Sequence, residues 1–160
     1  MNIRKTKIED LLILETNVIS DLRGYFYRAY SKESMSEIGI MDEFIQTNIS
    51  YNFSKGTIRG MHMQLSPHSE IKLIRCIKGS VYDVVIDMRK NSVTFLQYFG
   101  VELSESNALS MLIPKGFAHG FQTLEDNSIM LYQHSSIYNS NSEFSVSFLE
   151  PRINIKWPLD

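Results

Sequence analysis

The sequence has little of three features that mark common classes of protein. Cys76 is its single cysteine, so no disulfide can form within the chain. No apolar run approaches the roughly 20 residues that a membrane-spanning helix requires, and residues 1–5 do not lead into the apolar core of a signal peptide. No long run of lysine and arginine occurs, and the formal net charge is −2. We therefore expect a cytoplasmic protein that binds neither nucleic acid nor membranes.

The composition that remains is sufficient for one folded domain. The chain has 160 residues, of which 43% are hydrophobic and 11% are aromatic, enough to fill a single core. We predict one domain over residues 1–160. The neighbours of Cys76 predict a buried strand, where a thiol keeps its proton, so this cysteine is not expected to act as a nucleophile.

Short segments rich in β-branched and aromatic residues recur along the chain, separated by Gly, Pro, Asn and Ser. This pattern is typical of an all-β sandwich or barrel. A short helix is predicted at residues 31–38, with Ser31 as its N-cap. The turn Lys78-Gly79-Ser80 is predicted to join two antiparallel strands. The predicted strands are 11–15, 24–30, 44–51, 57–64, 72–78, 80–87, 96–103, 110–113, 118–123, 128–135 and 144–148.

These elements predict one antiparallel jelly-roll barrel with one or two short helices outside it. A sheet closed on itself leaves a mouth lined by side chains, where a small polar ligand can bind. Alternation along residues 81–87 places Asp83 and Asp87 on one face of a strand, so at least one carboxylate can point inward and then needs a partner. The simpler alternatives are that Asp83 is a hydrogen-bonded core residue and that Asp87 begins a solvated turn.

Two of the four histidines lie in unusual surroundings. His62 and Arg59 interrupt an apolar strand, and His119 has glycines near it on both sides, which lets the backbone and a ligand approach closely. A lone histidine in a strand is most often a hydrogen-bonded core residue. Two such histidines, together with Arg59, Lys72 and Asp83, favour a functional site.

The spacing of the histidines does not favour a metal site. Metal-binding barrels usually offer two histidines separated by one residue, but the position two after His62 is Gln64, a poor ligand for zinc or iron. We therefore predict no bound metal. His68 is interpreted as a solvent-exposed loop residue. His134 shares strand parity with Tyr132, so it either lines the same cavity or does not take part in the site.

A series of motifs runs in one order over nearly the whole chain, and together they resemble the dTDP-4-dehydrorhamnose 3,5-epimerases, which are cupin-type jelly rolls. Any one motif is weak, but the series is highly specific. The matching stretches are residues 21–26 (DLRGYF), 44–48 (FIQTN), 58–64 (IRGMHMQ), 72–75 (KLIR), 79–89 (GSVYDVVIDMR), 103–104 (LS), 113–121 (IPKGFAHGF) and 155–158 (IKWP).

The resemblance implies proton transfer next to the ketone of a nucleoside-diphosphate 4-keto-6-deoxyhexose, in the synthesis of surface polysaccharide, with no cofactor. By the family motif, His62 is the base, and an imidazole with a pKa of about 6.5 is partly neutral near pH 7. Lys72 would stabilise the enolate oxygen, and Tyr132 would return a proton on the opposite face. His119 and Asp83 would form a second pair beneath the sugar.

The resemblance also implies a nucleotide site. Arg23 and Arg59 would pair with the diphosphate, because guanidinium groups bind phosphate oxygens bidentately. Without the family match, Arg23 is more simply a surface turn residue and Phe26 a core residue. The residues implied for the base are Phe26 and Tyr138, which would stack on it, and Gln46 and Asn48, which would contact its polar edges.

The chain departs from the family pattern at three places. The family commonly has Glu at the position of Arg28 and His at the position of Ile49, so another base or sugar is allowed. In the family, an aspartate beyond the Trp-Pro pair partners the base histidine, whereas the sequence given ends at Asp160, two residues after Pro158. We expect that another carboxylate orients His62, that the base is weaker, or that a further segment belongs to the protein.

Several alternatives remain open at this point. The enzyme could act at both carbons 3 and 5, or at only one of them, or it could be a ketoisomerase of a related nucleotide sugar. A non-catalytic nucleotide-sugar-binding homologue and a metal-dependent cupin oxygenase are the readings from other classes. The family also implies a homodimer, in which an N-terminal strand crosses to the neighbouring barrel and helps to complete its nucleotide site.

Overall fold

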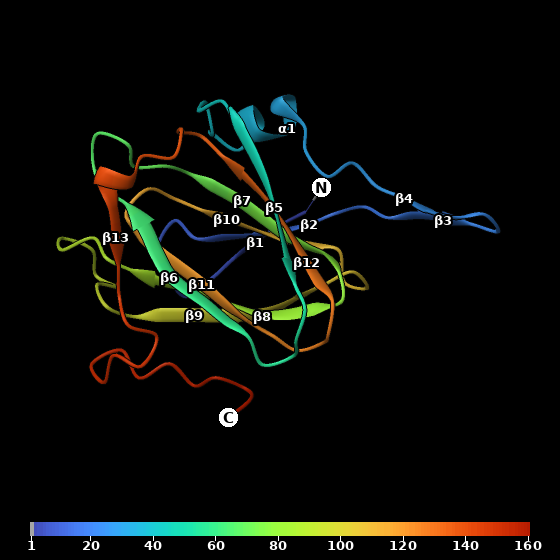
Figure 1. The fold of residues 1–160 in the computed structure, drawn as a ribbon. Coiled ribbons are helices and arrows are strands. Elements are labelled where there is room, and N and C mark those ends of the chain that lie inside the picture. Colours follow the sequence, from blue (N-terminus) through green and yellow to red (C-terminus); the bar gives the residue numbers. More distant parts are fainter. Residues whose placement is uncertain (1) are drawn as a thin grey trace.

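The computed structural model describes residues 2–160, and two antiparallel sheets account for most of them (Figure 1). The prediction of an all-β fold with short helices is confirmed. The strands are β1 (Asn2–Lys5), β2 (Leu12–Glu15), β3 (Ile19–Asp21), β4 (Gly24–Phe26), β5 (Gln46–Asn52), β6 (Ile58–Gln64), β7 (Lys72–Lys78), β8 (Ser80–Asp87), β9 (Tyr98–Ser104), β10 (Leu109–Ile113), β11 (Phe117–Thr123), β12 (Ser128–His134) and β13 (Glu143–Ser145). The helices are α1 (Lys32–Glu37) and the 3-10 helix η1 (Ser140–Ser142).

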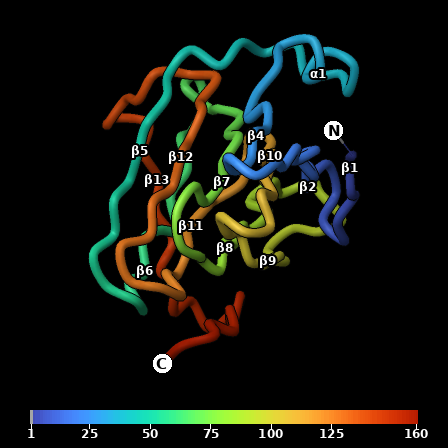
Figure 2. Tube along the Cα trace, turned by 90° about the vertical axis from the view of Figure 1, so that its right-hand side faces the viewer, coloured from blue at the N-terminus to red at the C-terminus, as the bar shows by residue number. Residues whose placement is uncertain are grey.

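One sheet has six strands in the order β1-β2-β10-β7-β12-β5, and the other has five in the order β13-β6-β11-β8-β9. Figures 1 and 2 show the two sheets facing each other, with the β3–β4 ribbon extending away from them. Most of the predicted strands match, but the strand predicted at 24–30 stops at Phe26. Residues 27–30 leave the ribbon and lead back toward α1 instead.

The turn Lys78-Gly79-Ser80 does not form the predicted hairpin. It joins β7 of the six-stranded sheet to β8 of the five-stranded sheet, and these two strands are not hydrogen-bonded to each other. Gly79 has φ +72°, and a Cβ built on it would lie 2.6 Å from the Oγ of Ser128. The prediction was wrong because a glycine turn between two apolar strands suits a connection between sheets as well as a hairpin.

The hydrophobic core lies in three layers. The interior between the sheets holds residues such as Ile74, Val85 and Phe121. The outer face of the six-stranded sheet is covered by α1, whose Met35 is buried against it, and Ser31 caps this helix as predicted by accepting a hydrogen bond from the Ser34 amide. The outer face of the five-stranded sheet is covered by residues 146–157 of the C-terminal segment. With both outer faces covered, the interior between the sheets is left for a site.

A close contact between β6 and β11 sets the register of the two histidines. A Cβ built on Gly60 would lie 2.5 Å from the Cα of Gly120, so neither position has room for a larger residue without a shift of the backbone. This approach places His62 opposite His119 in the ladder. The glycines next to the histidines in the sequence therefore allow β6 and β11 to approach closely enough for His62 and His119 to face each other in the ladder.

Candidate active site

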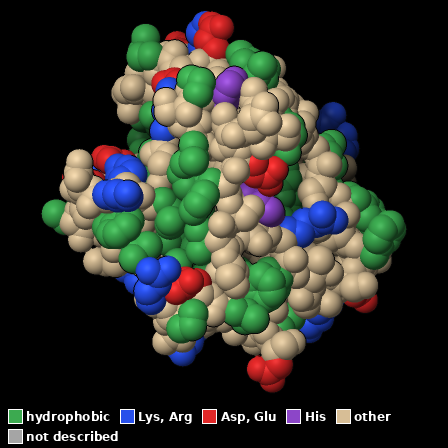
Figure 3. All heavy atoms as spheres, turned by 60° about the vertical axis from the view of Figure 1, so that its left-hand side comes forward, with side chains coloured by type: hydrophobic (Ala, Val, Ile, Leu, Met, Phe, Trp, Pro, Cys, Tyr) green, Lys and Arg blue, Asp and Glu red, His purple; other side chains and the backbone are tan. Residues whose placement is uncertain are grey.

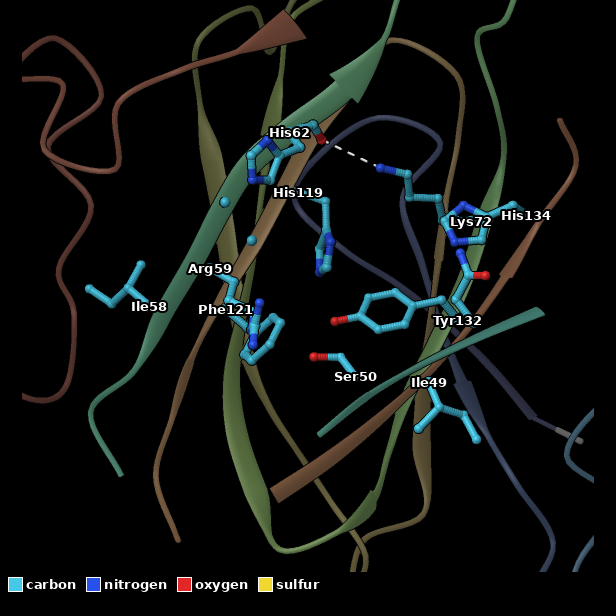
Figure 4. Close-up of a pocket in the computed structure, with 13 residues that line it drawn as sticks. Ile49, Ser50, Ile58, Arg59, His62, Lys72, His119, Phe121, Tyr132 and His134 are labelled. Carbon is cyan, nitrogen blue, oxygen red and sulfur yellow. Dashed lines mark hydrogen bonds between the residues drawn. The ribbon is translucent and has the colours of Figure 1, made fainter. Parts of the chain in front are cut away.

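A cavity of about 530 Å³ opens between the two sheets. Figure 4 shows side chains from β5, β6, β7, β11 and β12 directed toward it. The face of the molecule turned forward in Figure 3 has a hollow where histidine, acidic and basic side chains gather. The cavity is lined by Asn48, Ile49, Ser50, Ile58, Arg59, Gly60, His62, Lys72, His119, Gly120, Phe121, Tyr132 and His134.

His62 lies at the mouth of this cavity with its side chain 51% exposed. Its Nδ1 is 3.0 Å from the Oγ of Ser145 and 3.2 Å from Oε1 of Glu143. Both partners come from β13, which pairs with β6 and brings Ser145 opposite His62. An Nδ1–H bonded to these oxygens leaves Nε2 as the unprotonated nitrogen, which is the form that a general base requires.

His119 forms a buried pair with Asp83 at the base of the cavity. Its Nε2 is 3.0 and 3.1 Å from the two carboxylate oxygens. The Asp83 side chain has no exposed surface, and burial raises the pKa of its carboxyl group while the neighbouring His119 opposes that rise. Asp83 therefore points inward and its partner is an imidazole on β11, an arrangement that fits both interpretations of this residue made from the sequence.

Tyr132 lies between two imidazole rings. Its ring centroid is 6.1 Å from that of His119, in an edge-on arrangement, and 6.1 Å from that of His134, in a stacked arrangement. Burial raises the pKa of the Tyr132 phenol far above its usual value, and the negative charge of Asp83 adds to this rise. The phenol is therefore protonated at neutral pH and can act only as a proton donor.

Lys72 reaches the cavity from β7 on the opposite side from His62. Its Nζ donates to the backbone oxygen of His62 at 3.4 Å (Figure 4). The same Nζ lies 3.3 Å from Oε1 of Glu70. Glu70 also accepts a hydrogen bond from Nδ1 of His134, at 2.9 Å. His134 also lines the cavity, together with Tyr132. Of the two interpretations of His134 made from the sequence, this is the one in which it shares the cavity with Tyr132.

The expected nucleotide residues divide into two groups. Arg59 and Asn48 line the cavity, and the Arg59 guanidinium is held by Oδ1 of Asn52 at 2.7 Å. Arg23 and Phe26 do not line it, since they lie on the β3–β4 ribbon around a separate hollow. There the Arg23 side chain pairs with Asp21 at 2.6 Å and is almost fully exposed. Within one chain, the ribbon residues and the cavity are thus not brought together.

Tyr138 and Gln46 lie beside the cavity mouth and contact each other. The amide of Tyr138 donates to Oε1 of Gln46 at 3.2 Å, and the Tyr138 hydroxyl donates to Oε2 of Glu143 at 2.7 Å. The same glutamate therefore contacts both His62 and Tyr138. Arg28, which departs from the family pattern, lines a third hollow together with Arg75 and is not part of the main cavity.

Two predictions about single residues were wrong. His68 is partly buried, because its Nδ1 bonds to Ser142 at 2.9 Å and so ties its loop to η1. Asp87 is fully buried and is bound by Arg89, Ser92 and Thr94, so it does not begin a solvated turn. Those bonds lower its pKa to about 2 against the opposing effect of burial. Cys76 is buried, and burial raises the pKa of its thiol to about 11.

Sequence reasoning missed Glu70, Glu143 and Ser145, which hold the cavity side chains. All three reach the site through loop conformation or strand pairing between distant segments, for which the local sequence gives no signal.

Within residues 2–160, no three His, Cys, Asp or Glu side chains are grouped as metal ligands. None of the helices in that part of the chain has the length and apolar character needed to cross a membrane.

The fold and the cavity define a class of protein: a β-barrel whose interior carries imidazoles, an ammonium group and a protonated phenol, groups suited to moving protons on a bound carbon acid. The chain belongs to the dTDP-4-dehydrorhamnose 3,5-epimerase family, whose model matches residues 5–160. Membership makes it a nucleotide-sugar epimerase of the cupin-like fold, in agreement with the resemblance found in the sequence.

Individual relatives match the chain over almost its full length. A dTDP-4-dehydrorhamnose 3,5-epimerase of Shigella flexneri is 41% identical over 160 residues, covering 99% of this chain and 88% of the relative. The crystal structure of that enzyme from Bacillus anthracis, with TDP and PPi bound, has 38% identity and a TM-score of 0.96 over 99% of this chain and 91% of that one. An epimerase from Legionella pneumophila in complex with dTDP-4-keto-L-rhamnose has 41% identity and a TM-score of 0.95, covering 99% and 84%.

Proposed function

We propose that this chain acts as one domain that epimerises carbons 3 and 5 of a dTDP-linked 4-keto-6-deoxyhexose, with His62 as base, Tyr132 as acid and Lys72 at the ketone oxygen. The observation that carries the proposal is the convergence of these three side chains on one cavity from β6, β12 and β7. The bound nucleotide and sugar named for the relatives support the choice of substrate. The proposal places the enzyme in the cytoplasm and assigns it to the synthesis of surface polysaccharide.

The chemistry follows from the acidity of a proton next to a ketone. His62 removes the proton from the carbon, and the C–H electron pair forms a double bond to the carbonyl carbon. The π electrons of the carbonyl move to its oxygen, and the Lys72 ammonium stabilises the resulting enolate. Tyr132 then donates its proton to the same carbon from the other face, which inverts the configuration. The imidazolium and the phenolate return to their starting states by exchange with solvent, so each turnover is balanced and needs no redox cofactor.

The nucleotide end of the substrate would lie along the cavity mouth. Arg59 is fixed by Asn52 and presents its guanidinium to the cavity, where it would bind the diphosphate. Asn48 on β5 and the adjacent Gln46 would contact the polar edges of the base, and Tyr138 would stack on it. His119 and Asp83 would support the sugar ring from below, because their pair closes the base of the cavity.

The experiment that tests the function is a proton-exchange assay in deuterated water with dTDP-linked and other nucleotide-linked 4-keto-6-deoxyhexoses. Deuterium at carbons 3 and 5 together with inverted product supports the proposal. Deuterium at one carbon only supports the single-carbon epimerase. Tight binding without exchange would instead identify a non-catalytic nucleotide-sugar-binding homologue.

A second copy of the chain would supply Arg23 and Phe26, so we propose a homodimer. The β3–β4 ribbon extends from the barrel and exposes Ile19, Leu22 and Phe26 to solvent (Figure 1). A two-stranded ribbon is only marginally stable alone, and exposed apolar side chains gathered on it favour contact with another surface. In a dimer the ribbon of one copy would then complete the nucleotide site of the other.

Complementation between two inactive variants is the expected result if the ribbon acts across the dimer. Chains with Arg23→Ala and Phe26→Ala should bind dTDP weakly, and chains with His62→Asn should lack the base. Co-refolding the two should restore exchange, since each mixed dimer has one site with an intact base and an intact ribbon. Activity is measured against each variant refolded alone. Sedimentation as a monomer at micromolar concentration, or no restoration in the mixture, would count against the dimer.

Replacing Glu143 with glutamine should lower the exchange rate at least about tenfold. This is a part of the roughly 10²–10⁴-fold rate enhancement that a general base typically contributes. The carboxylate is 3.2 Å from Nδ1 of His62 and stabilises the imidazolium that forms when the base accepts a proton. Ser145 would still contact the His62 ring, so some activity should remain. The matched control is Glu105→Gln, which removes a carboxylate that contacts Tyr25 instead. An unchanged rate in Glu143→Gln would show that Ser145 alone orients the base.

A further inference from the structure

Glu70 and His134 form a second carboxylate–imidazole pair in the cavity, in addition to Asp83 and His119. The Nδ1 of His134 is 2.9 Å from one oxygen of Glu70, and Nζ of Lys72 is 3.3 Å from the other. The three side chains are nearly buried, at 7% exposure for Glu70, 10% for Lys72 and 13% for His134. No residue role proposed above uses Glu70 or His134.

The strand pairing explains why a carboxylate is needed there. His134 and Lys72 are direct partners in the ladder between β12 and β7, so two groups able to carry positive charge lie side by side. Like charges directly opposite each other in a sheet destabilise it. Glu70 lies just before β7 and contacts both groups. It therefore offers a hydrogen-bond acceptor to both side chains.

The backbone around Glu70 is fixed by hydrogen bonds to the end of β12. The amide of Ile71 donates to Oγ of Ser135 at 2.8 Å, and the amide of Ser135 donates to the oxygen of Ile71 at 3.0 Å. Burial by itself would raise the pKa of Glu70, but the hydrogen bond from His134 and the charge of Lys72 outweigh it and lower that pKa. The carboxylate is therefore ionised at neutral pH and held in one place.

The contacts of Lys72 leave one donor for the substrate. An ammonium group has three N–H donors, and two acceptors, Oε1 of Glu70 and the backbone oxygen of His62, lie near Nζ. The third donor is left for the cavity that Lys72 lines. A lysine side chain that is free to rotate loses conformational entropy when it is fixed, whereas one held beforehand stabilises developing charge without further rearrangement.

We propose that Glu70 is the positioning residue for Lys72, that it holds this side chain directed at the ketone oxygen, and that His134 holds Glu70 in place. This inference rests on the proposed role of Lys72 in the reaction. The other charged or titratable groups that line the cavity with Lys72 are Arg59 and His62 from β6, His119 from β11 and Tyr132 from β12, and Asp83 from β8 is bonded to His119.

The test uses Glu70→Gln, which keeps the shape of the side chain and removes its charge, with Glu37→Gln on the exposed end of α1 as the matched control. We expect the kcat of deuterium exchange to fall roughly tenfold, because an ammonium group that is no longer held beside the ketone oxygen stabilises the developing charge less. The affinity for dTDP and the KM should stay within about twofold, because the nucleotide end does not contact Glu70.

A second readout does not depend on catalysis. The rate at which acetic anhydride modifies Lys72, followed by mass spectrometry, reports how accessible the amine is, and it should rise in Glu70→Gln because the carboxylate no longer holds the amine. If the unsubstituted protein shows no exchange but this rate still rises, the proposed function fails and the positioning role stands. If exchange occurs and the variant retains the original kcat and acetylation rate, the positioning role is overturned.

His134→Phe provides an independent variant in case Glu70→Gln does not fold. The phenyl ring preserves the stacking on Tyr132 but cannot donate to Glu70. The variant should lower kcat and raise the acetylation rate of Lys72, as Glu70→Gln does, but each change should be smaller than in Glu70→Gln. The double variant should be no worse than Glu70→Gln alone, because both substitutions disturb one network. Additive losses, or a loss confined to KM, would refute the network.

Discussion

Replacing His62 with asparagine should lower the rate of deuterium incorporation at carbons 3 and 5 by about 10²–10⁴-fold, which is the range that a general base contributes. Asparagine can still accept a contact from Ser145 or the substrate, but it cannot take up a proton. The affinity for dTDP should not change, because the proposed diphosphate contact is Arg59 and no nucleotide contact is proposed for His62. Exchange is measured by NMR and binding by titration calorimetry.

The control for this variant is His68→Asn, since His68 is tied to Ser142 outside the cavity. It should keep exchange near the rate of the unsubstituted enzyme, even if its melting temperature falls. Exchange at the original rate in His62→Asn would move the role of base to another group. The nearest alternative is His119, but its ring already contacts Asp83 and lies deeper in the cavity.

The strands could be predicted from the sequence because each carries its own pattern, but their pairing could not. The segment 72–78 carries four apolar residues between Lys72, Arg75 and Lys78. In the structure β7 lies in the middle of the six-stranded sheet, covered on one face by the core between the sheets and on the other by α1 and the residues packed around Met35. Nothing in residues 78–80 distinguishes a turn within a sheet from a turn between sheets. That distinction depends on which strands are already paired, and therefore on the whole chain.

The candidate site shows the same division. His62, Lys72, His119 and Tyr132 could be named from local motifs, and they line one cavity. The carboxylates that hold them were not all found. Asp83 was marked by strand alternation, whereas Glu70 and Glu143 lie outside or at the start of a strand and have no local pattern that marks them. Their roles arise from contacts between segments more than 60 residues apart, such as the bond from His134 to Glu70.

Replacing Tyr132 with phenylalanine should separate exchange from inversion. The ring would still fill the space between His119 and His134, so the cavity should keep its shape, but no proton could be delivered to the face opposite His62. His62 could still remove a proton, exchange it with solvent and return it to the same face. We therefore expect formation of the inverted product to fall by about 10²–10⁴-fold, while deuterium incorporation falls much less.

The ratio of exchange to inversion is the decisive quantity in this variant, because a general loss of folding would lower both rates together. Tyr51→Phe is the matched control, since it removes a phenol that donates to Asn127 at 2.7 Å on the exposed face of β5. It should leave both rates unchanged. If Tyr132→Phe loses exchange and inversion equally, Tyr132 acts in enolate formation rather than in protonation. If it loses neither, the acid is another group, and solvent that enters the cavity is then the simplest proton source.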